Sequence, residues 1–125
     1  MNENELSKII VGACIEVHKE LGPGLLESVY EHCLSLELLR AGLEIRRQQA
    51  LPVVYKGETL DIGFRLDIWV NEKVIIEVKA VELLNDIHLA QILTYLKLTN
   101  NKLGILINFN ELKIVNGIRR VVNKL

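Results

Sequence analysis

The sequence predicts an α/β (α+β) fold in which helices flank one mixed β-sheet, and three observations support it. Apolar residues recur at helical spacing between residues 6 and 41. From Leu43 the pattern changes to the alternating and β-branched residues that are typical of strands. Another helical segment then lies between two apolar strands. The expected order of elements is α-α-β-β-β-α-β, and helices on the faces of one mixed sheet can bury these elements.

Two helices joined by a short connection are expected at the start of the chain. The first carries an apolar stripe at three- and four-residue steps and ends at Gly22-Pro23-Gly24. The second should run from about Leu26 to Ala41, with Gly42 as its stop. The inward positions are expected to be Leu6, Ile9, Ile10, Ala13, Cys14, Val17 and Leu21 in the first helix, and Leu26, Val29, Tyr30, Cys33, Leu34 and Leu38 in the second.

Three strands should follow, near residues 44–55, 59–70 and 74–79, with turns at 56–57 and 71–73. Pro52 lacks an N–H, so the first strand is expected at an edge of the sheet or interrupted there. A third helix is expected from a cap at Asn85 or Asp86 to about Thr99, with Ile87, Ala90, Leu93, Tyr95 and Leu96 as its apolar residues. Residues 103–109 read as a strand buried on both faces, and a short strand or helix follows Leu112.

Length and composition are those of one globular domain, residues 1–125, of which half are hydrophobic and a quarter are charged. The longest uncharged apolar runs are too short to span a bilayer, so no membrane association is expected. Cys14 and Cys33 are the only cysteines and form no cluster with zinc-ligand spacing. They are interpreted as small buried thiols, which places the protein in a reducing cytoplasm.

The net charge of −1 argues against binding of nucleic acid by the whole surface. The charge is unevenly distributed. Residues 1–37 contain seven Glu, whereas every charged residue after Glu111 is basic. A local basic strip is therefore compatible with the sequence.

The residues that could carry chemistry lie on two neighbouring strands. Side chains alternate along the strand of residues 74–79, so Glu77 and Lys79 share one face. The strand before it contributes Asp67, and whether Asp67 meets Glu77 depends on the register of the hairpin.

Two registers are open for this hairpin. A two-residue turn would pair Val70 with Lys73, and the two carboxylates would then lie on opposite faces. A three-residue turn pairs Val70 with Val74 and places Asp67 opposite Glu77. Such a loop commonly has its last residue, here Lys73, in the left-handed conformation. A β-bulge would also bring the two carboxylates to the same face.

Two facing carboxylates repel one another unless a cation or a proton lies between them. Oxygen ligands of this kind suit Mg²⁺ or Mn²⁺, with waters and phosphate oxygens completing the coordination. Lys79 would then hold or deprotonate an attacking water, or stabilise charge that develops on a phosphoryl group. The alternative is a solvated sheet face with a cross-strand ion pair, which contributes less than about 1 kcal/mol.

Three motifs connect the chain to a known family. Asp67 followed by Glu77-Val78-Lys79 resembles the D…(D/E)-x-K signature of the PD-(D/E)XK nuclease superfamily, although Leu66 stands in place of the proline. Residues 24–30 read Gly-Leu-Leu-Glu-Ser-Val-Tyr, so the chain resembles the GxxExxY family of small bacterial and archaeal proteins in that superfamily. Residues 91–95, Gln-Ile-Leu-Thr-Tyr, resemble the Q-x-x-x-Y motif of helicase-associated exonucleases. The resemblance covers nearly the whole chain.

The resemblance implies a restriction-endonuclease-like fold with a divalent metal ion, Mg²⁺ or Mn²⁺. It implies that Asp67 and Glu77 bind the metal together with the backbone carbonyl of Val78, and that Glu27 reaches the metal directly or through a water. Apart from the resemblance, Glu27 could equally be a carboxylate that favours a helix N-terminus.

The resemblance also implies roles for Gln91 and Tyr95. They are four residues apart, hence on one helical face, and would orient the site or a phosphate. Tyr95 could equally be a core aromatic residue whose hydroxyl is hydrogen-bonded.

Two functions from different classes follow. The first is a Mg²⁺-dependent nuclease that hydrolyses phosphodiester bonds of DNA or RNA, with DNA favoured. The second is a non-catalytic module that keeps the fold and binds a nucleic acid or a protein. A protein partner for targeting and a homodimer are further hypotheses.

Overall fold

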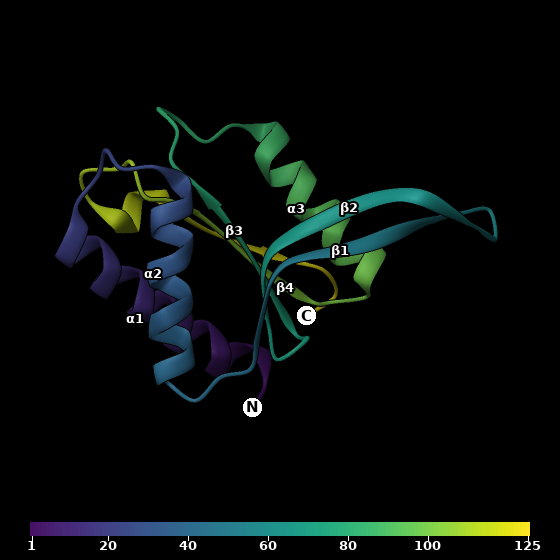
Figure 1. Cartoon of the computed structure of the whole chain (residues 1–125), viewed down its shortest axis with the longest axis horizontal. Coiled ribbons are helices and arrows are strands. Elements are labelled where there is room, and N and C mark those ends of the chain that lie inside the picture. The colour runs from purple at the N-terminus through teal and green to yellow at the C-terminus, as the bar shows by residue number, and fades with distance from the viewer.

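The computed structural model describes all 125 residues and forms one five-stranded sheet between two layers of helices (Figure 1). The sheet order is β1-β2-β3-β4-β5, with only the β3–β4 pair parallel. The fold is therefore the mixed α/β, restriction-endonuclease-like arrangement that the sequence predicts. The elements are α1 (Glu3–Leu21), α2 (Glu27–Arg40), β1 (Ile45–Tyr55), β2 (Glu58–Val70), β3 (Val74–Lys79), α3 (Asp86–Thr99), β4 (Leu103–Asn108), the 3₁₀ turn η1 (Ile114–Gly117) and β5 (Ile118–Val122).

The sheet separates two apolar clusters. On one face, alternate residues of β3 and β4 pack against α1 and α2 in the larger cluster. On the other face, Ile75 and Leu106 pack against Ile92 and Leu96 of α3. Because both faces are covered, β4 is buried along its whole length and β3 is buried as far as Val78. For β4 this confirms the prediction of a strand that is buried on both faces.

The helical hairpin forms as predicted, but the inward face of α2 is narrower than expected. Tyr30, Leu34 and Leu38 are fully buried, whereas Leu26 is 73% exposed because it is the N-cap residue and precedes the helix. Val29 is also exposed, and so are Leu21 of α1 and Ile87 of α3. No helix is both long enough and apolar enough to cross a membrane.

β1 and β2 form a long two-stranded ribbon that projects beyond the body of the molecule (Figure 1). As predicted from Pro52, β1 is an edge strand, and its pairing with β2 shifts between Pro52 and Val54. Lys56 and Gly57 form the turn, both with positive φ. Only the inner part of the ribbon therefore contacts the remaining elements.

The turn between β2 and β3 fixes the register that the site requires. Val70 pairs with Val74, so three residues separate the strands, and Lys73 N–H donates to Val70 O at 2.9 Å. The left-handed residues are Asn71 and Glu72, with φ of 51° and 53°, and not Lys73. The expectation for Lys73 was wrong because the tight turn needs positive φ at both of its central residues, and Asn71 adopts it readily.

Candidate active site

The site lies where β2 and β3 separate. The paired positions end at Ile68 and Ile76, and the next residues along the two strands are Asp67 and Glu77. At these positions, backbone N–H groups of one strand donate to side-chain carboxylates of the other strand instead of to its backbone carbonyls. Asp67 N–H donates to Glu77 Oε2 at 2.9 Å, and Val78 N–H donates to Asp67 Oδ2 at 2.8 Å. Each carboxylate is thereby held by a backbone donor of the other strand, with lone pairs left over.

Both carboxylates are in an environment that disfavours their negative charge. Burial, followed by the nearby charge of Asp67, raises the pKa of Glu77 to about 8. Burial also raises the pKa of Asp67, and the charge of Glu31 acts in the same direction. The Lys79 ammonium opposes both shifts without abolishing them. The pair would therefore be stabilised by a proton or by a bound cation.

Lys79 and Glu27 lie beside this pair. Lys79 is the half-buried last residue of β3, two positions after Glu77. Glu27 is the first residue of α2, and loss of solvent contact raises the pKa of its carboxyl although Lys79 and the Ala80 N–H lower it. The charges of Asp67 and Glu31 also raise the pKa of Glu27, so four acidic side chains and one lysine share this region.

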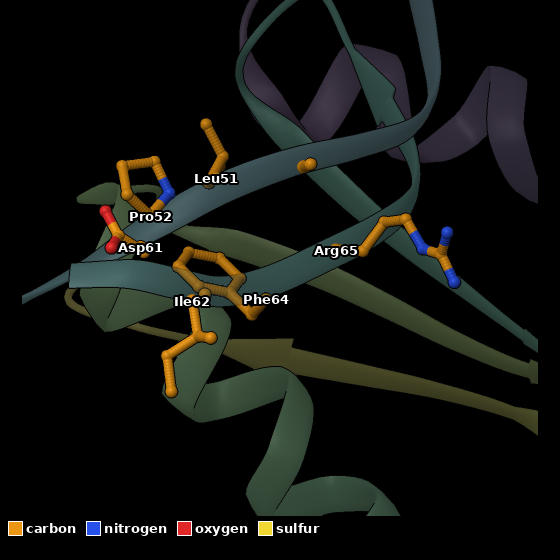
Figure 2. Close-up of a pocket in the computed structure, with 8 residues that line it drawn as sticks. Leu51, Pro52, Asp61, Ile62, Phe64 and Arg65 are labelled. Carbon is orange, nitrogen blue, oxygen red and sulfur yellow. The ribbon is translucent and has the colours of Figure 1, made fainter.

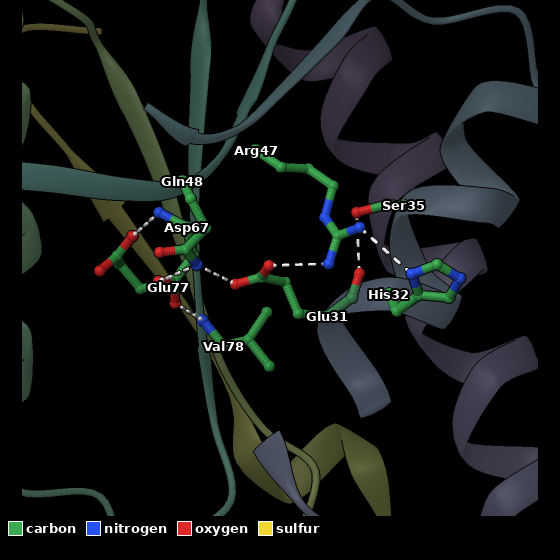
Figure 3. Close-up of polar contacts among 8 residues, drawn as sticks. All are labelled: Glu31, His32, Ser35, Arg47, Gln48, Asp67, Glu77 and Val78. Carbon is green, nitrogen blue, oxygen red and sulfur yellow. Dashed lines mark hydrogen bonds and ion pairs between the residues drawn. The ribbon is translucent and has the colours of Figure 1, made fainter. Parts of the chain in front are cut away.

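Two neighbouring residues, Glu31 and Gln48, were not foreseen from the sequence (Figure 3). Glu31 of α2 is only 7% exposed, and its carboxylate accepts from Arg47 at 3.0 Å and from Gln48 Nε2 at 2.5 Å. The same Gln48 nitrogen lies 3.4 Å from Asp67 Oδ1. The helical periodicity of α2 could have identified Glu31 from the sequence, because this residue lies next to Tyr30 on the buried face of the helix.

The two residues predicted on α3 differ in their surroundings. Tyr95 is half-buried and stacks on Phe64 of β2, with ring centroids 5.1 Å apart. Burial and then the charges of Glu77 and Asp67 raise the pKa of its hydroxyl, so this hydroxyl is electrostatically coupled to the carboxylate pair. Gln91 lies one turn earlier, is exposed, and makes no hydrogen bond to the other predicted site residues.

The G-x-x-E-x-x-Y segment has a clear structural role. The Tyr30 hydroxyl donates to Gly22 O at 2.6 Å and accepts from Leu25 N–H at 3.0 Å. This fixes the α1–α2 connection and therefore the position at which α2 begins, with Glu27. Tyr30 is thus a core aromatic residue with a satisfied hydroxyl.

Asn108 fixes the chain that leaves β3. This fully buried residue ends β4; its Oδ1 accepts from Val81 N–H at 3.0 Å and its Nδ2 donates to Val81 O at 2.9 Å. Because Lys79 pairs with Asn108 in the parallel ladder, these bonds hold the segment beside the lysine.

The carboxylates of the site can be judged against the ligands that a divalent cation requires. No group of three or more His, Cys, Asp or Glu side chains is arranged to hold a metal ion. Mg²⁺, however, is usually bound by only one or two carboxylates, with waters and phosphate oxygens as its other ligands. Asp67 and Glu77 each use one oxygen to accept a backbone N–H, so the pair fits such a two-carboxylate site.

A shallow groove lies elsewhere, on the β1–β2 ribbon (Figure 2). It contains no member of the carboxylate pair. The residues that line it are Ala50, Leu51, Pro52, Asp61, Ile62, Gly63, Phe64 and Arg65.

Comparisons with known proteins agree with this geometry. No curated protein and no solved structure matches the chain. The family model described as the PD-(D/E)XK nuclease superfamily matches residues 4–121, which is nearly the entire sequence. Proteins of that superfamily generally use divalent metal ions and act on nucleic acids. The chain therefore belongs to the PD-(D/E)XK nuclease superfamily.

Proposed function

We propose that this protein is a nuclease that depends on Mg²⁺ or Mn²⁺ and hydrolyses phosphodiester bonds of DNA or RNA, with DNA as the favoured substrate. The observation that carries the proposal is a pair of hydrogen bonds between β2 and β3. Asp67 N–H donates to Glu77 Oε2 and Val78 N–H donates to Asp67 Oδ2, so that two carboxylates with raised pKa values are held at neighbouring positions. In the proposal, both carboxylates bind the metal. The carbonyl of Val78 supplies a further ligand, and Glu27 reaches the metal through a coordinated water, since no third carboxylate is arranged to bind the ion directly.

The residues of the chain have separate tasks in this reaction. A bound divalent ion would polarise the scissile phosphate and lower the pKa of a coordinated water. Lys79 holds the attacking water or stabilises the negative charge on the phosphoryl oxygens, since an ammonium beside the carboxylate pair is suited to either task. Tyr95 limits the site on the α3 side, and the exposed Gln91 is available to contact a phosphate.

The first experiment is calorimetric titration of Mn²⁺ into the wild type and the Glu77→Ala variant, together with cleavage assays on single- and double-stranded DNA and RNA. Glu58→Ala is the matched control, because Glu58 is exposed at the far end of the ribbon. The proposal expects binding and cleavage in the wild type and in Glu58→Ala, and neither in Glu77→Ala. Absence of Mn²⁺ binding by the wild type would contradict it.

The second candidate is a non-catalytic module that binds a nucleic acid or a partner protein. The net charge of −1 favours a module that binds a partner protein, or an enzyme that relies on a partner for its substrate, because binding of nucleic acid by a whole surface usually rests on a basic excess. Absence of Mn²⁺ binding by the wild type would support this module, whereas Mn²⁺ binding without cleavage of any of the four substrates would point to another substrate or to a missing partner. A homodimer could engage two strands of a nucleic acid. Light scattering at high protein concentration tests this idea, and a monomeric mass would exclude it.

Residues 1–125 are treated as one nuclease-like domain in this proposal, and a cytoplasmic location is proposed with it. Both cysteines are free thiols, Cys14 buried and Cys33 half-buried. Free thiols are typical of reducing compartments.

A further inference from the structure

We propose that Gln48 is a positioning residue of the site, whose side-chain amide fixes the Asp67 carboxylate by bridging it to the buried Glu31. The inference rests on the proposed function in so far as Asp67 is a metal ligand. The bridge itself is a property of the metal-free protein and can be tested separately. It is built from three elements, because Glu31 lies on α2, Gln48 on β1 and Asp67 on β2 (Figure 3).

The backbone at Gln48 shows that this position is specialised. β1 pairs with β2 at Arg47 and again at Gln49, but the ladder omits Gln48 and Asp67. Gln48 has φ of 49°, a left-handed conformation that costs free energy for a residue with a side chain. Such conformations persist where surrounding structure enforces them, and they are concentrated at functional sites. Because Arg47 and Gln49 keep the same register with β2, Gln48 stands opposite Asp67, and its side-chain amide reaches the carboxylates of Asp67 and Glu31.

The side chain uses one nitrogen for two acceptors. Gln48 Nε2 donates to Glu31 Oε1 at 2.5 Å and lies 3.4 Å from Asp67 Oδ1. An amide nitrogen carries two N–H donors, so each carboxylate takes one. The opposite amide orientation would place a carbonyl oxygen against two carboxylates, which disfavours it. The orientation of the amide is therefore determined by the two acids.

Glu31 provides the fixed end of the bridge. Its second oxygen accepts from the Arg47 guanidinium at 3.0 Å, and Arg47 also contacts His32 Nδ1 at 3.2 Å. A buried carboxylate that is paired and hydrogen-bonded in this way has little freedom to rotate. The rigid Glu31 can thus hold Gln48, and Gln48 can hold Asp67.

The bridge also completes the restraint on Asp67. Val78 N–H holds Oδ2 at 2.8 Å, and the Gln48 amide constrains Oδ1 from another direction. With both oxygens restrained, the carboxylate plane is set before a cation arrives. Outer-shell partners of metal ligands that act in this way change metal affinity by roughly 10- to 100-fold when they are removed.

The test compares Gln48→Gly with Gln49→Ala. Gln48→Gly removes the amide, and because glycine adopts the left-handed backbone without penalty, the relief of backbone strain offsets the lost hydrogen bond to Glu31, so the free energy of unfolding should stay close to that of the wild type. The Gln49 amide donates only to Ala50 O at 3.1 Å, which makes Gln49→Ala a matched control on the next residue. We expect Mn²⁺ affinity measured by calorimetry to fall about tenfold in Gln48→Gly and to be unchanged in Gln49→Ala.

Wild-type Mn²⁺ affinity in Gln48→Gly would overturn the inference. A loss of affinity that accompanies a comparable loss of folding stability would also overturn it, because that result indicates a purely structural role.

A second measurement needs neither metal nor activity. In the ¹⁵N NMR spectrum of the metal-free protein, the two Gln48 side-chain amide protons should respond separately, one to Asp67→Asn and the other to Glu31→Gln. Amide signals that respond to neither change would exclude the bridge. Because this result does not depend on Mn²⁺ binding, failure of the nuclease proposal and failure of the Gln48 inference can be distinguished.

Discussion

The rings of Tyr30 and Phe109 stack with centroids 4.6 Å apart and planes 4° from parallel. Tyr30 belongs to α2, and Phe109 directly follows β4, so the stack joins the helical hairpin to the centre of the sheet. The Tyr30 hydroxyl simultaneously holds the loop that precedes Glu27. One side chain therefore connects the packing of the core to the placement of a candidate metal ligand.

Tyr30→Phe should preserve the stack and remove only the hydroxyl. Gly22 O and Leu25 N–H would each lose a hydrogen-bond partner, and we expect the free energy of unfolding to fall by about 2 kcal/mol. Urea unfolding measures this change. Tyr55→Phe is the control, because Tyr55 is 60% exposed and its loss should alter stability little. Equal effects of the two substitutions would contradict the assigned role of the Tyr30 hydroxyl.

Glu77 should make the stability of the metal-free protein depend on pH. The pKa of Glu77 is about 8 in the folded protein against 4.5 for the ordinary carboxyl, so between these values the folded state binds a proton that the unfolded chain has released. The stabilisation is present below pH 4.5 and is lost as the pH rises through about 8. The difference between 4.5 and about 8 corresponds to a stabilisation on the order of 5 kcal/mol.

Glu77→Gln tests this expectation because glutamine retains an acceptor for Asp67 N–H but does not titrate. In the presence of a chelator, the variant should be more stable than the wild type at pH 8.5 by about 4 kcal/mol, with a smaller difference at pH 5. Chemical unfolding at both pH values gives the comparison. A difference that does not vary with pH would show that Glu77 keeps an ordinary pKa.

Mg²⁺ should stabilise the wild type more at high pH than at low pH. Carboxylates must lose their protons to bind a metal, so binding at pH 6 competes with the proton that Glu77 retains. At saturating Mg²⁺ we expect the Tm to rise by about 5 °C at pH 8.5 and by less at pH 6. Calorimetric scans measure the Tm. Glu77→Ala should show no rise at either pH, and an equal rise there would place the metal elsewhere.

Lys79→Met should separate metal binding from catalysis. Methionine preserves much of the apolar stem but removes the ammonium, so kcat should fall by roughly 10² to 10⁴. Mn²⁺ affinity should be retained or increased, because a positive charge beside the carboxylates is removed. Lys97→Met, on the exposed side of α3, is the control. Loss of Mn²⁺ affinity together with kcat would indicate that Lys79 serves to organise the ligands.

The sequence predicted the elements well because their signals are local. The proline in β1, the turn at Lys56-Gly57 and the cap at Asn85 each act on neighbouring backbone, and each lies where it was expected. The misplacement of Leu26 shows the limit of periodicity, since a helix that begins one residue later leaves that side chain outside.

The candidate site was predicted in part. Alternation along β3 and a choice between two registers were enough to place Glu77 with Asp67, and the structure has the favourable register. Gln48 could not be found in the same way, because its left-handed backbone and its place opposite Asp67 arise only when β1 pairs with β2. Glu31 acquires its partners only after α2 packs on the sheet.

The β2–β3 turn also has a consequence for the order of folding. Asp67 and Glu77 are ten positions apart and meet through one short hairpin, so closing that loop costs little chain entropy. Glu31 and Glu27 reach the same region only through contacts of much longer sequence separation. Formation of such contacts is commonly slow. In a stopped-flow refolding experiment, a partly folded chain could therefore bring its two carboxylates together before α2 arrives to shield and orient them.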